Sequence, residues 1–517
     1  MARSWIGSDQ GRQTALPMPV DAGDLLPAGH AAFVFAAVVQ QLDLSAFSAV
    51  YRADGKGRPP FHPKVMVALL LYCRSKGIMS GRGVAAACHD DLGARMITGN
   101  RYPKRSTVDR FIKNQRVALK GLLAQTLRLG QVEGLVNVSV VAGDGTYLLA
   151  NAAMGATIDE NGLLAQIGDL EQKLATAEAA WRELLDDTAP TLFADAHTNP
   201  PGPPLPDDVK TTQARRRVST LTATLRSRRA ALEHLRTHPN TNLTDWADKL
   251  QRDRERIQRG IERVEHARAT AQARLDRRHA VEANGKRIRG ARPVPVEDHI
   301  RVRDAHRALA TATARAEATA ANRPTTTRVN TTDPTSQIMP GKHDGFDQRH
   351  NVQALACENQ FIIAITTHDS SNDKQALINL ILRGRANLDA AGITDPIRTA
   401  LFDNGYASEA NFTADLPVET LLVAVEKEAR QTQRLNDDTS TAAKAWHTMA
   451  ARLNEPDNRN LYKQRAAIIE PLFAQLFARF RRNLNSRGDD VDTELHLWAT
   501  THNILKINRR RAKTRPG

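Results

Sequence analysis

The chain is long and basic, and it contains few cysteine and aromatic residues. Its 517 residues are enough for about two to four domains, and 72 Lys and Arg against 57 Asp and Glu give a net charge of +15. This excess favours a polyanionic partner, while an aromatic content of 5% argues against a stacking platform for single strands. Cys73, Cys88 and Cys357 have no CxxC spacing, so we expect neither a zinc site nor a disulfide framework, and a cytoplasmic location fits. The longest apolar runs are too short to cross a bilayer, which predicts no membrane partner.

The first part of the chain is predicted to be helical. Residues 1–28 have the composition of a loose leader, and residues 29–132 carry apolar side chains at helical spacing. Short helices joined by basic turns resemble a helix-turn-helix arrangement, in which basic side chains would face DNA phosphates. The candidates are Arg101, Lys104, Arg105, Arg110 and Lys113. A solvated basic face on an ordinary helical domain is the alternative.

A short β-strand pattern follows in residues 133–156. Its β-branched residues favour a strand, and Gly143 and Gly145 bracket the predicted end of that strand. Asp144 is therefore expected where the strand ends. A lone carboxylate in such a place is usually a turn residue or a helix cap, and only two later acids suggest a different role.

Residues 157–322 differ in composition from both flanks. They are rich in Ala, Arg, Glu, Leu and Gln, and they form long amphipathic patterns typical of helices. We expect a helical insertion shaped as an antiparallel hairpin or coiled coil, with a structural or dimerisation role favoured over a catalytic one. Its many arginines could also contact DNA.

Strand patterns return in residues 323–487. Two strands are predicted around a hairpin turn at Glu358 and Asn359, and a further strand, IRTALFD, is expected to end at Asp403. Glu470 lies in the helical pattern IIEPLFAQLFARF, where Pro471 either kinks the helix or marks a restart that makes Glu470 a cap. Residues 488–517 are predicted to be an apolar helix followed by a basic tail that adds affinity for phosphates.

The three separated acids Asp144, Asp403 and Glu470 suit a site for two magnesium ions. Hard divalent cations prefer oxygen ligands, and phosphoryl transfer uses metals to stabilise the attacking and leaving oxygens. The pattern therefore favours metal-dependent chemistry on a phosphate ester.

At this point the sequence resembles the DDE transposases of bacterial insertion sequences. Four stretches carry the likeness, and together they cover most of the chain outside the leader and the insertion. They are SGRGVAAACHDDLGARMITGNRYPKRSTVDRF, GDGTYLLANAA, the run from TTDPTSQIM through NDKQAL to FDNGY, and YKQRAAIIEPLFAQLFARF with THNILKI behind it. The resemblance implies an α+β or α/β fold: an RNase H-like mixed sheet flanked by helices, with an N-terminal helical DNA-binding domain.

The resemblance also implies roles for individual residues. Asp144, Asp403 and Glu470 match the catalytic acids, which would hold two Mg²⁺ ions, with Mn²⁺ as a substitute. Tyr462 and Arg465 match a Tyr-x-x-Arg element that contacts DNA near the cleaved end.

Other positions match the family less closely. Asp333, Asn351 and Asp373 lie in family-like motifs and are interpreted as structural or supporting residues. Many relatives have Gly where this chain has Ala474, and Lys where it has Phe477. The nearest basic residues, which we assign to DNA binding in place of that lysine, are Arg479, Arg481 and Arg482.

The predicted function is binding of the terminal inverted repeats of an insertion sequence, followed by DNA cleavage and strand transfer. The expected partners are double-stranded DNA and a second copy of the chain, because two ends must be brought together. A related RNase H-like nuclease, which cuts without joining, is one alternative. The other is a catalytically silent DNA-binding or assembly protein derived from a transposase.

Overall fold

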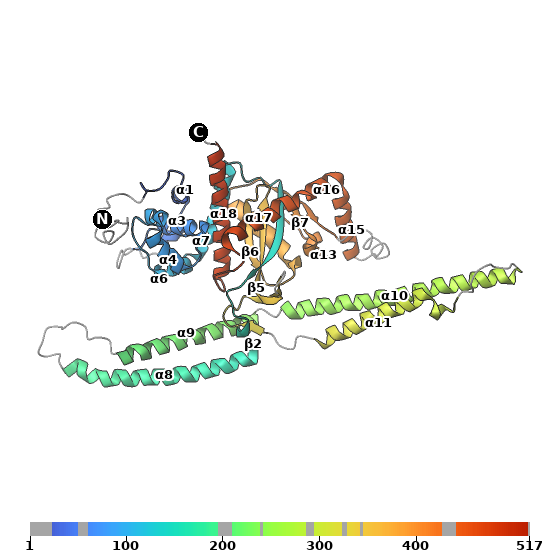
Figure 1. Ribbon diagram of the computed structural model, residues 1–517, viewed down its shortest axis with the longest axis horizontal. Helices are drawn as coiled ribbons and strands as arrows, with labels where there is room; N and C mark the ends of the chain where they lie inside the picture. The colour runs from blue at the N-terminus through green and yellow to red at the C-terminus, as the bar shows by residue number, and fades with distance from the viewer. Residues whose placement is uncertain are drawn as a thin grey trace, which may run out of the picture. The chain divides into compact units, whose positions relative to one another are not determined.

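The computed structural model describes residues 23–49, 60–194, 209–237, 241–285, 294–322, 328–341, 345–425 and 441–514. The chain divides into two compact units (Figure 1): Met1–Met154 with Thr335–Gly517, and Gly155–Pro334. Most of the predicted leader and the last residues of the predicted tail lie outside the described residues. No helix in the described ranges is long and apolar enough to cross a membrane.

The first unit begins with a cluster of helices that share one apolar core. They are α1 (Ala31–Gln40), α2 (Ser45–Ser48), α3 (Pro63–Ser75), α4 (Gly81–Asp90), α5 (Leu92–Thr98), α6 (Arg105–Asn114) and α7 (Arg116–Val132). The central helix α3 begins at a proline, whose fixed φ suits a first helical position, and Met66 to Cys73 are all buried. Ser80 caps α4 by accepting a hydrogen bond of 3.1 Å from the Gly83 amide.

A mixed sheet follows, and its strands come from both sides of the second unit in the sequence. They are β1 (Val140–Leu149), β4 (Gln337–Pro340), β5 (Phe346–Cys357), β6 (Ile362–His368), β7 (Ile397–Phe402) and β8 (Val418–Val423). Strand β1 is central, with β5 antiparallel on one side and β7 parallel on the other. The far edge of β5 pairs with β4 and β6, and β8 is parallel to β7. The mixture of sheet and helices is as predicted, and so is the β5–β6 hairpin.

The prediction that β1 ends at Asp144 was wrong. The strand continues to Leu149 and remains paired with β5 as far as Arg349. The flanking glycines do not break the strand but allow close packing on it. A Cβ at Gly143 would lie 2.2 Å from the Phe402 ring, and one at Gly145 would lie 2.4 Å from Nε2 of Gln353. The residues before and after Asp144 are therefore both fixed by pairing with β5.

Helices cover the sheet and connect it to the N-terminal helices. They are α12 (Ala376–Ala390), α13 (Glu409–Thr413), α15 (Thr441–Asn454), α16 (Pro456–Tyr462), α17 (Gln464–Phe480) and α18 (Asp490–Thr514), with the short 3₁₀ turns η4 (Asp373–Gln375) and η5 (Asn404–Tyr406). Helix α17 runs through Pro471 without a restart, so Glu470 is not a cap. Helix α18 lies between the N-terminal helices and the sheet (Figure 1), and Leu497, Trp498 and Ile507 contribute to three different apolar cores. It is thus a shared core element.

The second unit consists of paired helices and a small two-stranded sheet. Its elements are β2 (Thr157–Asp159), α8 (Glu160–Ala194), α9 (Val209–Thr237), α10 (Thr241–Ala283), η3 (Val296–Asp298), α11 (Ile300–Ala321) and β3 (Arg328–Asn330), with η2 (Met154–Ala156) at its start. Helix α8 packs on α9, and α10 packs on α11, as the pattern of long amphipathic helices predicts. Thr157 pairs with Asn330, so β2 and β3 join the two ends of the insertion. We call this two-stranded sheet the clasp.

Candidate active site

Two carboxylates, which we call the acid pair, face each other across neighbouring parallel strands. The register pairs Val140 with Thr399 and Ala142 with Leu401, so two residues further along each strand Asp144 comes level with Asp403. Asp403 directly follows β7, where its Oδ1 accepts a hydrogen bond of 2.9 Å from the Gly405 amide and caps η5. Sheet pairing thus fixes the backbone at Asp144, and the cap of η5 fixes the backbone at Asp403.

The acid pair is electrostatically unfavourable as it stands. Burial and the nearby charge of Asp403 raise the pKa of Asp144 from 3.8 to about 6. Arg465 on α17 opposes this rise, because its Nη1 lies 3.3 Å from Oδ2 of Asp144. One guanidinium only partly offsets the negative charge of two carboxylates, so the acid pair retains a charge that a further cation would neutralise.

Tyr462 and Arg465, the two residues of the Tyr-x-x-Arg element, lie beside the acid pair. The Tyr462 hydroxyl donates a hydrogen bond of 3.1 Å to the carbonyl oxygen of Phe402, the residue before Asp403. Burial raises the pKa of Tyr462, so the phenol is protonated at neutral pH. Tyr462 and Arg465 therefore connect α16 and α17 to the end of β7 and to the middle of β1.

A third carboxylate, Asp373, approaches the acid pair from the start of η4. Its Oδ1 accepts hydrogen bonds of 2.8 Å from Nδ2 of Asn351 and 2.7 Å from Nε2 of Gln353. Its other oxygen faces the backbone at Gly405, where a Cβ would lie 3.4 Å from Asp373 Oδ2 and 3.0 Å from Asp403 Oδ1. Asp373 is thus held rigidly by two amides while one oxygen faces the loop that carries Asp403.

Sequence reasoning assigned no role to Gln353 and Tyr406. The buried Tyr406 hydroxyl donates to Oε1 of Gln353, while the Gln353 amide holds Asp373. Burial and then the charges of Asp373, Asp144 and Asp403 raise the Tyr406 pKa well above its usual value. A signal for Gln353 was available: it is a polar residue within the apolar second half of β5, on the same face as Asn351.

Glu470 occupies a different face of α17 from Arg465. It is five residues further along, which is about 140° around the helix, and its side chain is exposed. The charges with the largest effects on Asp144 are those of Asp403 and Arg465. The structure therefore brings Asp144, Asp403, Tyr462 and Arg465 together, with Asp373 next to the loop that carries Asp403.

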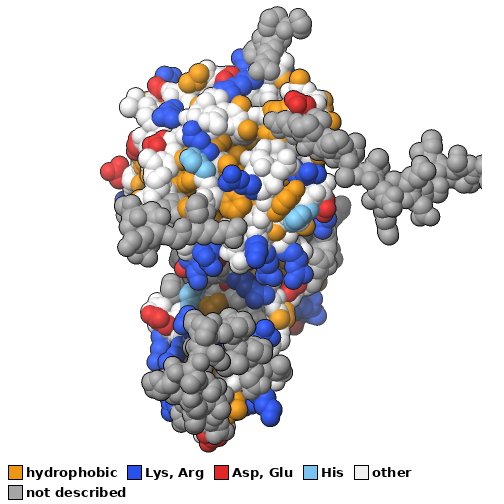
Figure 2. Space-filling view, turned by 90° about the vertical axis from the view of Figure 1, so that its left-hand side faces the viewer, with side chains coloured by type: hydrophobic (Ala, Val, Ile, Leu, Met, Phe, Trp, Pro, Cys, Tyr) orange, Lys and Arg blue, Asp and Glu red, His pale blue; other side chains and the backbone are white. Residues whose placement is uncertain are grey.

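The basic residues assigned to DNA lie in three places. Arg101, Lys104, Arg105, Arg110 and Lys113 are all exposed on α6 and the loop before it. Figure 2 shows Lys and Arg side chains on the side of the molecule that carries the N-terminal helices. Arg482 lies over the ring of Phe477 at 4.4 Å, so a cation remains next to the position where relatives carry lysine. Arg481 is exposed at the end of α17 with a φ of 63°, and Arg479 reaches α3, where its Nη1 donates to the Ser75 carbonyl at 2.6 Å.

The acid pair fits a small divalent cation by its donor chemistry. Both side chains offer oxygen, and the raised pKa of Asp144 reports a repulsion that a bound cation would relieve. Mg²⁺ is commonly held by one or two carboxylates, with water and substrate phosphates completing its shell. Within the described ranges, no group of three or more His, Cys, Asp or Glu side chains is arranged to hold a metal ion.

The fold is therefore a mixed sheet covered by helices, and its candidate site is an acid pair on two neighbouring parallel strands. The comparison with protein families then identifies part of the chain: residues 20–114 match the model of a transposase domain (DUF772). This match of the N-terminal helices supports the resemblance of the chain to transposases of insertion sequences. No curated protein and no solved structure matches the chain.

Proposed function

We propose that the protein is a DDE-type transposase that cleaves and joins DNA at the ends of an insertion sequence. The observation that carries this proposal is the register that sets Asp144 level with Asp403, next to Arg465. The strand order supports an RNase H-like sheet, because β5 and β6 are antiparallel to their neighbours while β7 and β8 run parallel to β1. The transposase domain at residues 20–114 supports the same function.

The chain's own residues would organise the reacting phosphate. Asp144 and Asp403 would hold two Mg²⁺ ions, which activate water or a 3′-hydroxyl and stabilise the leaving oxygen when bound. Arg465 neutralises part of the acid charge and orients Asp144. Tyr462 holds the end of β7, and its rim position suits contact with DNA near the cleaved end. No covalent protein–DNA intermediate is required, so no Ser or Tyr is assigned as a nucleophile.

The third acid of the triad is proposed to be Glu470, on the strength of its motif. In this structure its exposed side chain lies on another face of α17 from Arg465, so it would have to reach the site around the helix or after a shift of α17. Asp373 would support the site from the opposite side, as a positioning residue held by Asn351 and Gln353.

Recognition of the inverted repeats is assigned to the N-terminal helices. The exposed cations of α6 and its preceding loop suit phosphate contacts that set the register on a duplex. The test is a footprint on the repeat, comparing the full chain with a form that lacks residues 1–130. An unchanged footprint in the shortened form would refute this placement.

The decisive experiment is cleavage of a labelled duplex carrying the element's terminal repeat, with Mg²⁺ or Mn²⁺. We expect wild-type protein to nick at the repeat end and Asp403→Asn to bind without cutting. Asp395→Asn is the matched control, because this exposed carboxylate lies just before the same strand, at the end remote from the acid pair. Cutting by Asp403→Asn at the wild-type rate would overturn the proposal.

The alternatives predict different outcomes in the same assays. A nuclease would cut the repeat but would not join a pre-cleaved 3′ end to target DNA. A silent relative would bind tightly with no cutting in any variant, and the replacement of a family lysine by Phe477 is the feature that favours it.

A further inference from the structure

Two cavities of the first unit are lined by cations, and they differ in how their charge is balanced. The larger, of about 540 Å³, lies between α7, α12, β6 and the start of α18. The second region is a pair of adjoining hollows of about 130 and 270 Å³ that share Gln475, Ala478 and Arg479 of α17. The larger cavity is lined by carboxylates as well as cations, whereas no carboxylate is among the described residues that line the second.

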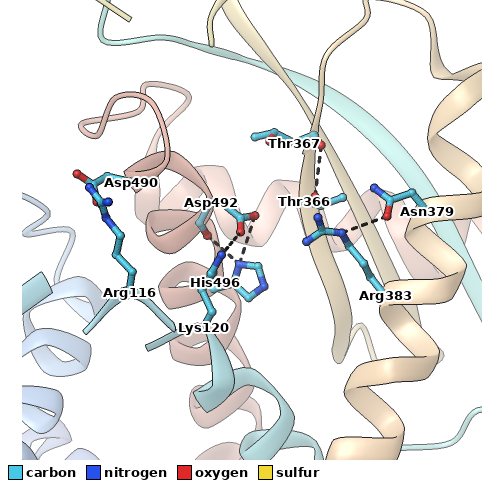
Figure 3. A network of polar contacts seen from close by, with 9 residues as sticks. All are labelled: Arg116, Lys120, Thr366, Thr367, Asn379, Arg383, Asp490, Asp492 and His496. Atoms are coloured by element: carbon cyan, nitrogen blue, oxygen red, sulfur yellow. Dashed lines mark hydrogen bonds and ion pairs between the residues drawn. The ribbon is translucent and has the colours of Figure 1, made fainter. Parts of the chain in front are cut away.

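In the larger cavity two cations are paired with carboxylates, and Arg383 donates to Oδ1 of Asn379 at 3.2 Å (Figure 3). Arg116 pairs with Asp490, and Nζ of Lys120 lies 3.0 Å from Oδ2 of Asp492. His496 contacts the same Asp492 through its backbone carbonyl, at 2.7 Å from Nδ1. We call Arg116, Lys120, Asp490, Asp492 and His496 the paired network. The charges of Arg116 and Lys120 are already neutralised by these carboxylates, so a bound anion would gain little from them.

The smaller hollows hold three cations with no such balance. Arg479 of α17 and Lys506 and Arg509 of α18 line the inner hollow, and no Asp or Glu is among the described residues that line either one. None of the three cations forms an ion pair with a carboxylate in the described parts of the chain. We call them the basic pocket.

Burial and mutual repulsion both act on the basic pocket. Desolvation and then the charge of Arg509 lower the pKa of Lys506 and of Arg479. Beside them, burial lowers the pKa of His502 to about 4, and its Nε2 donates to the Gln360 carbonyl at 2.9 Å. Lys506 is also held by neutral groups, with its Nζ 2.7 Å from Oε1 of Gln360. An anion in the pocket would relieve this repulsion, since charge-assisted hydrogen bonds to phosphate are among the stronger ones.

The position of the pocket on α17 relates it to the acid pair. Arg479 follows Arg465 by fourteen residues, so the two lie about 21 Å apart along the helix and within about 40° of the same face. The residues between them on this side of the helix, such as Leu472 and Leu476, are buried, so the pocket is a separate site at the other end of α17 from the acid pair.

We propose that the basic pocket binds a backbone phosphate of the DNA, at a position separate from the phosphate that reacts at the acid pair. This inference rests on the proposed function, and it adds Lys506 and Arg509 of α18 as DNA-binding residues. It also gives a role to the half-buried Lys506 and the exposed Arg509, which α18 carries next to α17.

The test is the salt dependence of binding to a labelled duplex, measured in EDTA so that cleavage plays no part. The slope of log K against log salt is negative, and each lost phosphate contact lowers its magnitude by about 0.9. We expect this decrease for Lys506→Gln and for Arg509→Gln. Arg398→Gln is the charge-matched control, because this exposed cation lies near the start of β7, at the end remote from Asp403, and its slope should equal that of wild type.

Inorganic phosphate separates the two sources of the same ligand chemistry. If phosphate raises the melting temperature of the wild type but both pocket variants keep the wild-type salt slope, the pocket takes free phosphate and the inference is overturned. It is also overturned if the slopes are unchanged and phosphate has no effect. If the pocket variants have a slope of lower magnitude but the wild-type protein does not cleave DNA, the pocket binds DNA phosphate and the proposed cleavage chemistry is wrong. Failure of wild-type protein to bind any duplex would remove both.

Discussion

The paired network and the acid pair are both built from charged side chains of the first unit, but they are balanced differently. In the paired network, Arg116 and Lys120 each meet a carboxylate of α18. In the acid pair, two carboxylates lie near one guanidinium, and burial together with the charge of Asp403 raises the pKa of Asp144 to about 6. Balanced charges hold helices together, whereas unbalanced charges mark places where a ligand has to complete the structure. The predictions below test this difference.

The largest effect is expected for Asp144→Asn. Loss of one carboxylate charge removes half of the oxygen-donor pair, so metal-dependent cleavage should become undetectable. Binding to the duplex should stay close to wild type, because the exposed cations are untouched. A single-turnover cleavage assay and a binding assay on the same preparation measure the two effects. Wild-type cleavage by this variant would show that the imbalance has no catalytic meaning.

A smaller effect on cleavage is expected for Asp373→Asn. This side chain positions the loop around Asp403 through Asn351 and Gln353, and loss of such supporting groups usually costs about 10- to 100-fold in activity or metal affinity. The measurement is the cleavage rate as a function of Mg²⁺ concentration. Asp369→Asn, four residues earlier and outside these contacts, serves as the control. Complete loss of activity at all Mg²⁺ concentrations would instead make Asp373 a direct ligand.

The acid pair should also lower stability when no metal is bound. The pKa of Asp144 is 3.8 in its ordinary state and about 6 in the folded protein, so the folded state holds the proton more tightly. Ionisation therefore opposes folding as the pH rises from about 4 to 6, and the full penalty applies above this range.

Asp144→Asn removes that penalty. We expect the variant to exceed wild type by about 1–3 kcal/mol at pH 8 and to equal it near pH 4, by urea unfolding in EDTA. Mg²⁺ should stabilise wild type at pH 8 more than the variant. If the wild type is more stable than Asp144→Asn at pH 8 in EDTA, the acid pair does not destabilise the folded protein.

The smallest effect is expected in the paired network. Arg116→Gln breaks a partly exposed ion pair with Asp490, which should cost about 1 kcal/mol or less of unfolding free energy. The salt slope of DNA binding should not change, in contrast to Lys506→Gln. A lowered slope in Arg116→Gln would show that the larger cavity also meets DNA.

Local pattern was sufficient to predict most strands of the sheet and the position of Asp403 directly after β7. Strand β7 is a β-branched and apolar run followed directly by Asp403, and β5 and β6 flank a short polar turn. The continuation of β1 beyond Asp144 could not be predicted, because glycines usually break strands. Here they admit the Phe402 ring and the Gln353 amide, which come from distant parts of the chain.

Contacts between distant segments explain the other differences. Tyr406 and Gln353 gain their roles only when β5 meets the loop after β7, and no pattern in either segment reveals that meeting. The face of α17 that carries Glu470 depends on how this helix docks, which periodicity alone does not fix. The same holds for α18, whose residues 488–517 form a separate segment in the sequence but contribute to three cores.

The clasp has a consequence for how the sheet can assemble. Leu149 of β1 must find Arg349 of β5 across about 200 residues of chain, and a search over such a loop is slow and entropically costly. Helix pairs of the insertion form from more local contacts, and pairing of Thr157 with Asn330 closes their ends together. The free loop that remains between β1 and β5 is then under about 30 residues, which reduces the closure cost by on the order of 1–2 kcal/mol. The insertion can thus fold first and act as an internal template that brings the two halves of the sheet within reach.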